Sequence, residues 1–312
     1  MSELSGHRFR VMGTDAHVVL HDGPIDALEQ AERRARALER SWSRFLADSE
    51  LSILNRNGGS PMAVSPETAL LLELAATGWS RTGGRFDPSV VPALVVAGYD
   101  RSFDELAAEA VVDGSPLAGR PTPGPAGVSV VRELGVAIVP PGVCIDPGGI
   151  GKGLAADLIS AELVAGGAAG ALVSIGGDLR VAGRPPAGGW TVEIDHDGER
   201  PLGTVRLVAG AVATSSILRR RWRTCEGETH HVIDPRTGRA TTGAAVACTV
   251  VAGEAWWAEA LSTALLVAWE GPARDVVAAD LLGDAAAVLT TRDGDLVRVG
   301  SDRVHLEGVR VP

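Results

Sequence analysis

The chain has 312 residues, of which 45% are hydrophobic and 22% charged, a composition typical of a globular protein with a sizeable core. Its formal net charge is −10, so the phosphate backbone of a nucleic acid is a poor partner for it. No segment approaches the roughly 20 consecutive apolar residues of a membrane-spanning helix.

The N-terminal twenty residues lack the apolar core, about 7–15 residues long, that a signal peptide needs. We therefore expect a cytoplasmic protein. The three cysteines, Cys144, Cys225 and Cys248, form no CxxC pair, so neither a disulfide framework nor a cysteine metal site is predicted.

In chain order, the first predicted element is a strand over residues 9–21, where apolar and polar side chains partly alternate. Two amphipathic helices are predicted next, over residues 24–46 and 66–81. Residues 113–125 are rich in Pro and Gly and are expected to form an exposed loop. Residues 128–139 predict strands around a turn.

The second half of the chain is predicted to alternate between strands and helices. A helix is expected over residues 153–165 and another over 256–269. Residues 285–311 predict antiparallel strands. Further strands are expected at residues 171–175, 190–195, 202–207, 211–214 and 246–251. Because no regular βαβ rhythm is present, the fold class is predicted to be α+β, with mixed, largely antiparallel sheets and packed helices.

The most informative stretch is DPGGIGKGLAAD at residues 146–157, directly after an apolar run that predicts a strand. A chain that turns through Gly148, Gly149 and Gly151 and enters a helix near Leu154 would direct free amides at an anion. Lys152 adds a positive charge suited to phosphate. The plain alternative is a glycine-rich turn with a solvated lysine. Neither GxxxxGK[ST] nor GxGxxG spacing is present, so phosphate binding would need a different architecture.

Seven further segments place glycine or another small residue beside Asp, Thr or His at expected strand ends, where functional sites collect. They are MGT (12–14), SRFLADSELSILN (43–55), GGRFDPSV (83–90), SIGGDL (174–179), ATSS (213–216), HHVIDPRTG (230–238) and AEALSTA (258–264).

Each segment also has a purely structural explanation. Asp87 and Asp234 each precede a proline and fit simple turns. His231 fits a hydrogen-bonded core histidine. Glu259 and Thr263 lie four residues apart, on one helical face, as a solvated Glu and a Thr bonded back into the helix would.

Taken together and in this order, the motifs resemble the ApbE family of FAD:protein FMN transferases over about residues 12–266. The resemblance implies a single domain over residues 1–312, with a motif-bearing core at about 9–270 and C-terminal strands at 285–311. It also implies two lobes around a flavin cleft.

The activity that the resemblance implies is transfer of the FMN half of FAD to a Thr or Ser hydroxyl of a target protein. A phosphoester forms and AMP is released, with FAD as substrate and Mg²⁺ as cofactor. Its partners would be FAD and a protein with an exposed Thr or Ser. Two alternatives remain: an FAD pyrophosphatase that yields FMN and AMP, and a protein that binds FAD without turnover.

The resemblance assigns roles residue by residue. The metal ligands would be Gly151, Glu259 and Thr263, and Glu259 is a departure because the family normally has Asp there. Lys152, His231 and Asp234 would be catalytic, with His231 the first candidate for the base. Residues at or near the flavin nucleotide would be Met12, Phe86, Asp87, Gly149, Lys152, Gly176, Gly177, Asp178, Thr214, Ser215 and Ile233.

Overall fold

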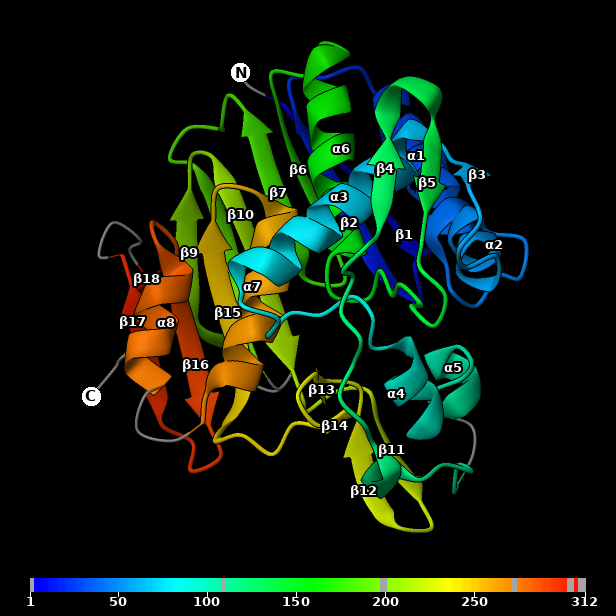
Figure 1. The fold of residues 1–312 in the computed structure, drawn as a ribbon. Helices are drawn as coiled ribbons and strands as arrows, with labels where there is room; N and C mark the ends of the chain where they lie inside the picture. The colour runs from blue at the N-terminus through cyan, green and yellow to red at the C-terminus, as the bar shows by residue number, and fades with distance from the viewer. Residues whose placement is uncertain (1–2, 108–109, 197–200, 271–273, 302–305, 308–312) are drawn as a thin grey trace. The chain divides into compact units, whose positions relative to one another are not determined.

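The computed structural model describes residues 3–107, 110–196, 201–270, 274–301 and 306–307. The chain divides into two compact units, each assembled from separate segments. We call the first the sheet unit, which contains Met1–Ala37, Lys152–Ser216 and Ala244–Pro312. The second is the helix-rich unit, which contains Leu38–Gly151 and Ile217–Gly243. Figure 1 labels the elements of both.

The sheet unit is built on an eight-stranded sheet with the order β1-β2-β6-β7-β10-β15-β16-β17. Every neighbouring pair of these strands is antiparallel, which confirms the predicted fold class. The strands are β1 (Leu4–Val11), β2 (Thr14–His21), β6 (Gly170–Ile175), β7 (Asp178–Gly183), β10 (Gly210–Ser216), β15 (Ala245–Ala252), β16 (Ala286–Thr291) and β17 (Leu296–Gly300).

Helices and a second sheet pack on the large sheet. Figure 1 shows α6 (Gly151–Ala165), α7 (Ala255–Ala268) and α8 (Arg274–Leu282) in front of it. A three-stranded sheet has the order β18-β9-β8, with β18 at Leu306–Glu307, β9 at Pro201–Leu207 and β8 at Trp190–Asp195. Trp190, Ile194 and Val205 form one apolar cluster with Val212 and Val251 of the large sheet. Burial of these side chains between the two sheets stabilises the unit.

The helix-rich unit contains small elements around two apolar clusters. The helix α1 (Asp26–Trp42) begins in the sheet unit and ends in this one. The other elements of the helix-rich unit are α2 (Glu50–Arg56), α3 (Pro66–Arg81), α4 (Val91–Val96), α5 (Phe103–Leu106), η1 (Pro116–Ala118), η2 (Arg132–Leu134), β3 (Met62–Ala63), β4 (Ser129–Val131), β5 (Val136–Ile138), β11 (Arg221–Thr224), β12 (Gly227–His230), β13 (Ile233–Asp234) and β14 (Arg239–Ala240).

The prediction of one strand over residues 9–21 is wrong, because the chain forms the β1–β2 hairpin there. Met12 and Gly13 have φ values of 54° and 66°. Positive φ at both central residues is the geometry of a two-residue hairpin turn. The alternating pattern continues on both sides of this turn, which hid it in the sequence.

The prediction of a strand that leads directly into the glycine-rich turn is also wrong. The strand β5 ends at Ile138, and no strand follows it among the described residues before the turn. Pro140 and Pro141 follow, and proline has no N–H for a sheet ladder. Val143 and Ile145 are nonetheless buried in an apolar cluster, so the apolar run reflects packing. The next helix, α6, begins at Gly151, three residues before Leu154.

Most other predicted elements are confirmed. The helix over 66–81 and the strand over 190–195 match α3 and β8. In the predicted tail, β16, β17 and β18 pair antiparallel with neighbouring strands, whereas residues 302–305 and 308–311 lie outside the described residues. In the described part of the chain, no helix combines the length and apolar character that a bilayer crossing requires.

Candidate functional site

Several predicted site residues of the sheet unit gather at one end of the large sheet. The turn at Met12 and Gly13 precedes β2, and the turn at Gly176 and Gly177 joins β6 to β7. Because β2 pairs antiparallel with β6, both turns lie at the same end. The end of β10 lies there too, since Val212 pairs with Leu179 near the start of β7. We call this end of the sheet, from Met12 to the last residues of β10, the site edge.

Lys152 supplies a positive charge at the site edge. Its Nζ lies 2.6 Å from Asp178 Oδ2 and also contacts Glu259 Oε1. The side chain of Lys152 is 18% exposed, and those of Asp178 and Glu259 are each 3% exposed. The aliphatic stem of Lys152 runs beside the Gly176 turn, where an added Cβ would lie 3.4 Å from Lys152 Cδ. The lysine is therefore a buried, paired charge rather than the solvated one of the plain alternative.

The charges of this triad shift one another's protonation. Burial lowers the pKa of Lys152, but the carboxylates of Asp178 and Glu259 raise that pKa more, so it lies above its usual range. Burial raises the pKa of Glu259 above its usual range, and Asp178 adds to the effect against the opposing influence of Lys152. The ammonium therefore stays charged at neutral pH.

The helices α6 and α7 cap each other's first turns. Glu259 Oε2 of α7 accepts a hydrogen bond of 2.8 Å from the Gly153 amide of α6. In return, Asp157 of α6 accepts hydrogen bonds from the amides of Ala255 and Trp256, at 3.0 and 2.9 Å. Carboxylates at helix N-termini satisfy free N–H groups and complement the helix dipole. The Gly153 amide, which the sequence pattern left available for an anion, is therefore already hydrogen-bonded to Glu259.

Other amides of the glycine-rich turn also bond within the chain. The Gly148 amide donates to Asp146 Oδ1 at 2.8 Å. The amides of Ile150 and Gly151 both donate to the carbonyl oxygen of Pro147, at 3.1 and 2.7 Å. The segment from 147 to 151 is consequently a turn that starts α6, and the expected cradle of free amides is not formed by these groups.

Gly153 is required for the contact between α6 and α7, and we predict that Gly153→Ala destabilises the protein. A Cβ there would overlap the carbonyl oxygen of Ala255. Alanine gains about 1 kcal/mol of helix propensity over glycine, but overpacking costs about 1–3 kcal/mol, and a backbone carbonyl cannot rotate away. Urea unfolding should give a net loss, whereas the control Gly253→Ala, where a Cβ meets nothing within 4 Å, should be nearly neutral. Equal stability of the two variants would contradict this packing.

Asp157 makes stability depend on pH in the acid range. Burial raises its pKa from 3.8 to about 6, against the opposing effect of the two amides and Arg180. A raised pKa means that the folded state binds the proton more tightly, so stability falls as pH rises from about 4 to 6. Relative to Asp157→Asn, wild type should lose up to about 3 kcal/mol of unfolding free energy across this window. Parallel curves for both proteins in chemical denaturation at pH 4, 5, 6 and 7 would refute it.

Thr214 and Ser215 point to opposite faces of the large sheet, as consecutive strand residues do. Ser215 Oγ lies 2.8 Å from Thr263 Oγ1 and 2.8 Å from Ser262 Oγ, on the side of α7. The hydroxyl of Thr214 instead lies 2.7 Å from Thr249 Oγ1. The Thr214 amide donates to Asp178 Oδ1 at 3.3 Å. Only Ser215 therefore shares a face with the predicted metal ligand Thr263.

The oxygen atoms on α7 fit a hard cation. Glu259 and Thr263 are one helical turn apart, and Ser215 adds a hydroxyl beside Thr263. Each carboxylate oxygen has two lone-pair directions, so the contacts of Glu259 with Lys152 and Gly153 leave it acceptor capacity. The carboxyl groups of Asp178 and Glu259 flank a single ammonium, so the triad has no excess positive charge that would repel a cation. Mg²⁺ suits few protein oxygens plus substrate phosphate, although the described residues contain no group of three or more His, Cys, Asp or Glu that could hold a metal.

In the helix-rich unit, Phe86 and Asp87 are buried and serve their own turn. Phe86 is 2% exposed. Asp87 Oδ1 accepts from the amide and hydroxyl of Ser89 at 2.8 and 2.7 Å, and Oδ2 accepts from Thr122 Oγ1 at 2.6 Å. The turn explanation of Asp87 is therefore met in full by contacts within this unit. Gly149 lies in the turn between the bonded amides of Gly148 and Ile150.

The HHVIDPRTG segment forms a tight two-stranded turn. Asp234 accepts hydrogen bonds from the Arg236 guanidinium at both carboxylate oxygens, at 3.0 and 2.7 Å. Its carbonyl oxygen accepts from the amides of Thr237 and Gly238, so Asp234 anchors the turn. Ile233 is buried in the apolar cluster of Tyr99 and Trp222. His231, two residues before β13, is half-buried.

Sequence reasoning missed several residues that shape the site edge. Asp157 ends the glycine-rich motif and was not assigned a role, yet it caps α7. His196 and Thr249 were not singled out, although both bond next to Thr214. Asp157 lies five residues after Lys152 on α6, and Glu259 is the fifth residue of α7. This spacing is a weak signal, and the capping roles are visible only from the contacts between the two helices.

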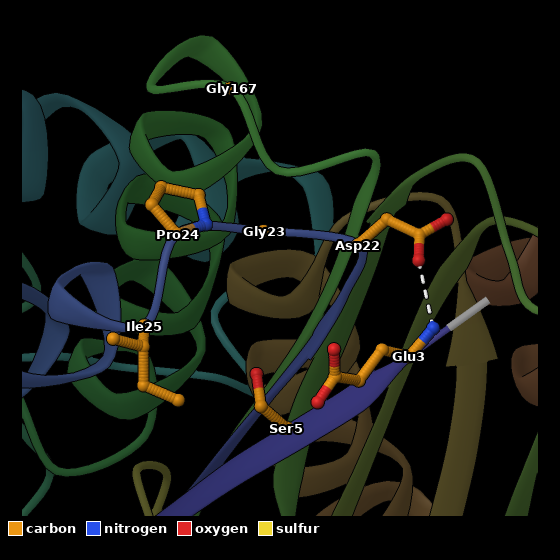
Figure 2. A pocket seen from close by; sticks show the side chains of 7 residues that line it. All are labelled: Glu3, Ser5, Asp22, Gly23, Pro24, Ile25 and Gly167. Atoms are coloured by element: carbon orange, nitrogen blue, oxygen red, sulfur yellow. Dashed lines mark hydrogen bonds between the residues drawn. The ribbon is translucent and has the colours of Figure 1, made fainter. Parts of the chain in front are cut away.

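A pocket elsewhere in the sheet unit contains none of the predicted site residues. Figure 2 shows Glu3, Ser5, Asp22 and Ile25 around it. The Glu3 amide donates to Asp22 Oδ1 at 2.8 Å. Because Leu4 pairs with His21 at the open end of the β1–β2 hairpin, this pocket lies a strand length from the site edge.

Comparison with known proteins agrees with this architecture. The model of the ApbE family matches residues 12–289. The FAD:protein FMN transferase of Rhodobacter capsulatus is 31% identical over 313 residues, covering 96% of this chain and 58% of that protein. The chain thus spans little more than half of that relative. The protein of the same name from Haemophilus influenzae is 28% identical, covering 88% of this chain and 82% of its own length.

Solved structures are similar over nearly the whole chain. The ApbE protein of Thermotoga maritima superposes with a TM-score of 0.82 at 25% identity, covering 95% of this chain and 97% of that one. The flavin transferase ApbE of Vibrio cholerae gives a TM-score of 0.74 at 22% identity, covering 97% and 98%, a likeness of fold. Because the family model covers most of the sequence, including every motif described above, the chain belongs to the ApbE family.

Proposed function

We propose that this protein transfers the FMN half of FAD to a Thr or Ser hydroxyl of a target protein. The hydroxyl oxygen forms a bond to the phosphorus of the FMN phosphate. The bond from that phosphorus to the bridging oxygen breaks, AMP leaves with that oxygen, and the hydroxyl proton passes to a base. The observation that carries the proposal is the buried Lys152 ammonium beside the Gly176–Gly177 turn at the site edge.

The role of Lys152 follows from its charge and restraint. A diphosphate gains negative charge on its oxygens as the bridge breaks, and a fixed ammonium stabilises that charge without having to reorganise. Asp178 and Glu259 hold the ammonium in place. The turn at Gly176 and Gly177 leaves open space beside the backbone, since a Cβ at Gly177 would meet nothing within 4 Å.

His231 is the proposed base for the target hydroxyl. Imidazole changes protonation near neutral pH and accepts a proton efficiently there. Asp234, the other candidate, bonds Arg236 with both carboxylate oxygens, so anchoring the HHVIDPRTG turn is the role we propose for it.

We further propose Mg²⁺ as the cofactor, with Glu259, Thr263 and the carbonyl oxygen of Gly151 as its protein ligands. When bound, Mg²⁺ would neutralise charge on the phosphoryl oxygens. Nucleotide contacts are proposed for Met12, Phe86, Asp87, Gly149, Gly176, Gly177, Asp178, Thr214, Ser215 and Ile233. We also propose a single functional domain over residues 1–312, with its motifs at about residues 9–270 and C-terminal strands at 285–311.

The test separates transfer from hydrolysis by the fate of AMP. The protein is incubated with FAD and Mg²⁺, with and without a small domain carrying an exposed Ser/Thr-Gly-Ala-Thr segment, and AMP is quantified by chromatography. Transfer predicts AMP only when the acceptor is present. Equal AMP without the acceptor would establish the pyrophosphatase instead, and intact FAD in both samples would indicate binding without turnover.

A further inference from the structure

A buried histidine outside the family motifs is connected to the site edge. His196 is 3% exposed and follows β8 directly. Its Nε2 lies 2.9 Å from Thr249 Oγ1, and its Nδ1 lies 2.5 Å from Thr290 Oγ1. With both ring nitrogens engaged, the ring is held by β15 on one side and β16 on the other.

Thr249 extends this contact to the end of β10. Its hydroxyl lies 2.7 Å from the Thr214 hydroxyl, and the two residues are directly paired across the strands. The Thr214 amide then donates to Asp178 Oδ1, while Asp178 Oδ2 pairs with Lys152. A continuous series of contacts thus joins His196, on the face covered by β8 and β9, to the lysine on the opposite face.

The end of β10 needs this support because its pairing is one-sided. The β10–β7 ladder extends only from Gly210 to Val212, so Thr214 has β15 as its sole strand partner among the described residues. The side chain of Asp178 replaces the missing ladder contact. A shift of the strand end would therefore move the carboxylate that holds Lys152.

The chemical character of the neighbourhood argues against simple packing. Val212 and Val251 alternate with Thr214 and Thr249 on the same face and belong to an apolar cluster. Valine has nearly the shape of threonine and carries no polar group that must be satisfied when buried. The hydroxyls of Thr214 and Thr249 and the His196 imidazole lie next to the site edge. Hydrogen bonds there fix the orientation of side chains more specifically than apolar packing does.

We propose that His196 is a positioning residue: acting through Thr249 and Thr214, it orients Asp178 and hence Lys152 toward the diphosphate. The proposal rests on the proposed function, because it assumes that Lys152 meets FAD. His196 itself touches neither substrate nor metal.

The test compares variants that differ by one hydroxyl. Thr249→Val removes the link and keeps the shape, whereas Thr249→Ser keeps the link. At a temperature where circular dichroism shows each protein fully folded, Thr249→Val should lower kcat for transfer about 10-fold, as misplacement of a positioning group does. Thr249→Ser should stay within about twofold of wild type, because its hydroxyl restores the bond. A purely structural role would lower Tm and leave kcat of the folded protein unchanged.

A second variant and a control make the result specific. His196→Ala should match Thr249→Val, and the double variant should be no slower than either, because both break one series of contacts. Ser160→Ala removes another buried hydroxyl, bonded to the Asp157 carbonyl, and should leave kcat unchanged. Wild-type kcat in Thr249→Val, or additive losses in the double variant, would overturn the inference.

Failure of the proposed function would be distinguishable. Wild-type protein that binds FAD by fluorescence quenching without transferring FMN would refute the transferase, and the inference would then require Thr249→Val to weaken FAD binding about 10-fold. Wild-type protein that neither binds FAD nor transfers FMN would overturn both.

Discussion

Replacing Lys152 with methionine should destabilise the protein by about 3–5 kcal/mol and abolish transfer, because removing one partner leaves buried charge uncompensated. Asp178 and Glu259 are each 3% exposed at the side chain and both depend on the ammonium. The loss should shrink as pH falls, since burial already raises the pKa of Glu259 and protonation removes the repulsion. Urea unfolding at pH 5 and pH 8 measures both effects.

The double variant Lys152→Met/Glu259→Gln separates charge from packing. Neutralising one carboxylate should recover at least half of the lost stability, because the pair of like charges is gone. Transfer should stay lost, since no ammonium remains. A Lys152→Met protein as stable as wild type at pH 8 would mean that Lys152 is solvated and that the triad does not form.

Glu259→Gln should remove the response of the protein to Mg²⁺. The amide oxygen still accepts from the Gly153 amide, so α6 keeps its cap, but the negative charge that attracts a cation is lost. Wild type should gain thermal stability with millimolar Mg²⁺ and FAD, as binding to the folded state requires. The variant should gain none and should lose transfer by at least about 100-fold.

Glu162→Gln is the matched control, because Glu162 lies on α6 but pairs with Arg34 at the surface. Its response to Mg²⁺ should equal that of wild type. A Glu259→Gln protein with an undiminished thermal shift would refute Glu259 as a ligand, while loss of the shift in both variants would point to a nonspecific charge effect.

Local sequence patterns predicted the helices and strands wherever the hydrophobic periodicity agreed with the capping and turn residues. The helix α3 begins after Ser65, whose side chain accepts from the Thr68 amide, and has proline in its first turn, both readable signals. The β1–β2 turn was missed because Met12 is not a residue expected at positive φ. The strand predicted before the glycine-rich turn does not form. Its apolar run reflects burial, and buried loops and strands both give apolar runs.

The sequence predicted which residues lie in the site, but it predicted their roles only in part. Lys152, Asp178 and Glu259 were each assigned, but their mutual contact depends on how α6, α7 and the start of β7 meet, which no spacing encodes. The positions of Thr214 and Ser215 on opposite faces follow from strand alternation, yet the motif alone suggested two equivalent hydroxyls. His196 could not be found because its partners come from β15 and β16, distant in sequence.

The intact mass of an acceptor domain after incubation with this protein, FAD and Mg²⁺ decides whether FMN is transferred. We expect a gain of one FMN on a single Thr or Ser, absent with Lys152→Met and absent when Mg²⁺ is chelated. An unchanged acceptor mass in the presence of wild-type protein that binds FAD would contradict transfer, and a gain that persists with Lys152→Met would contradict the role assigned to the buried ammonium.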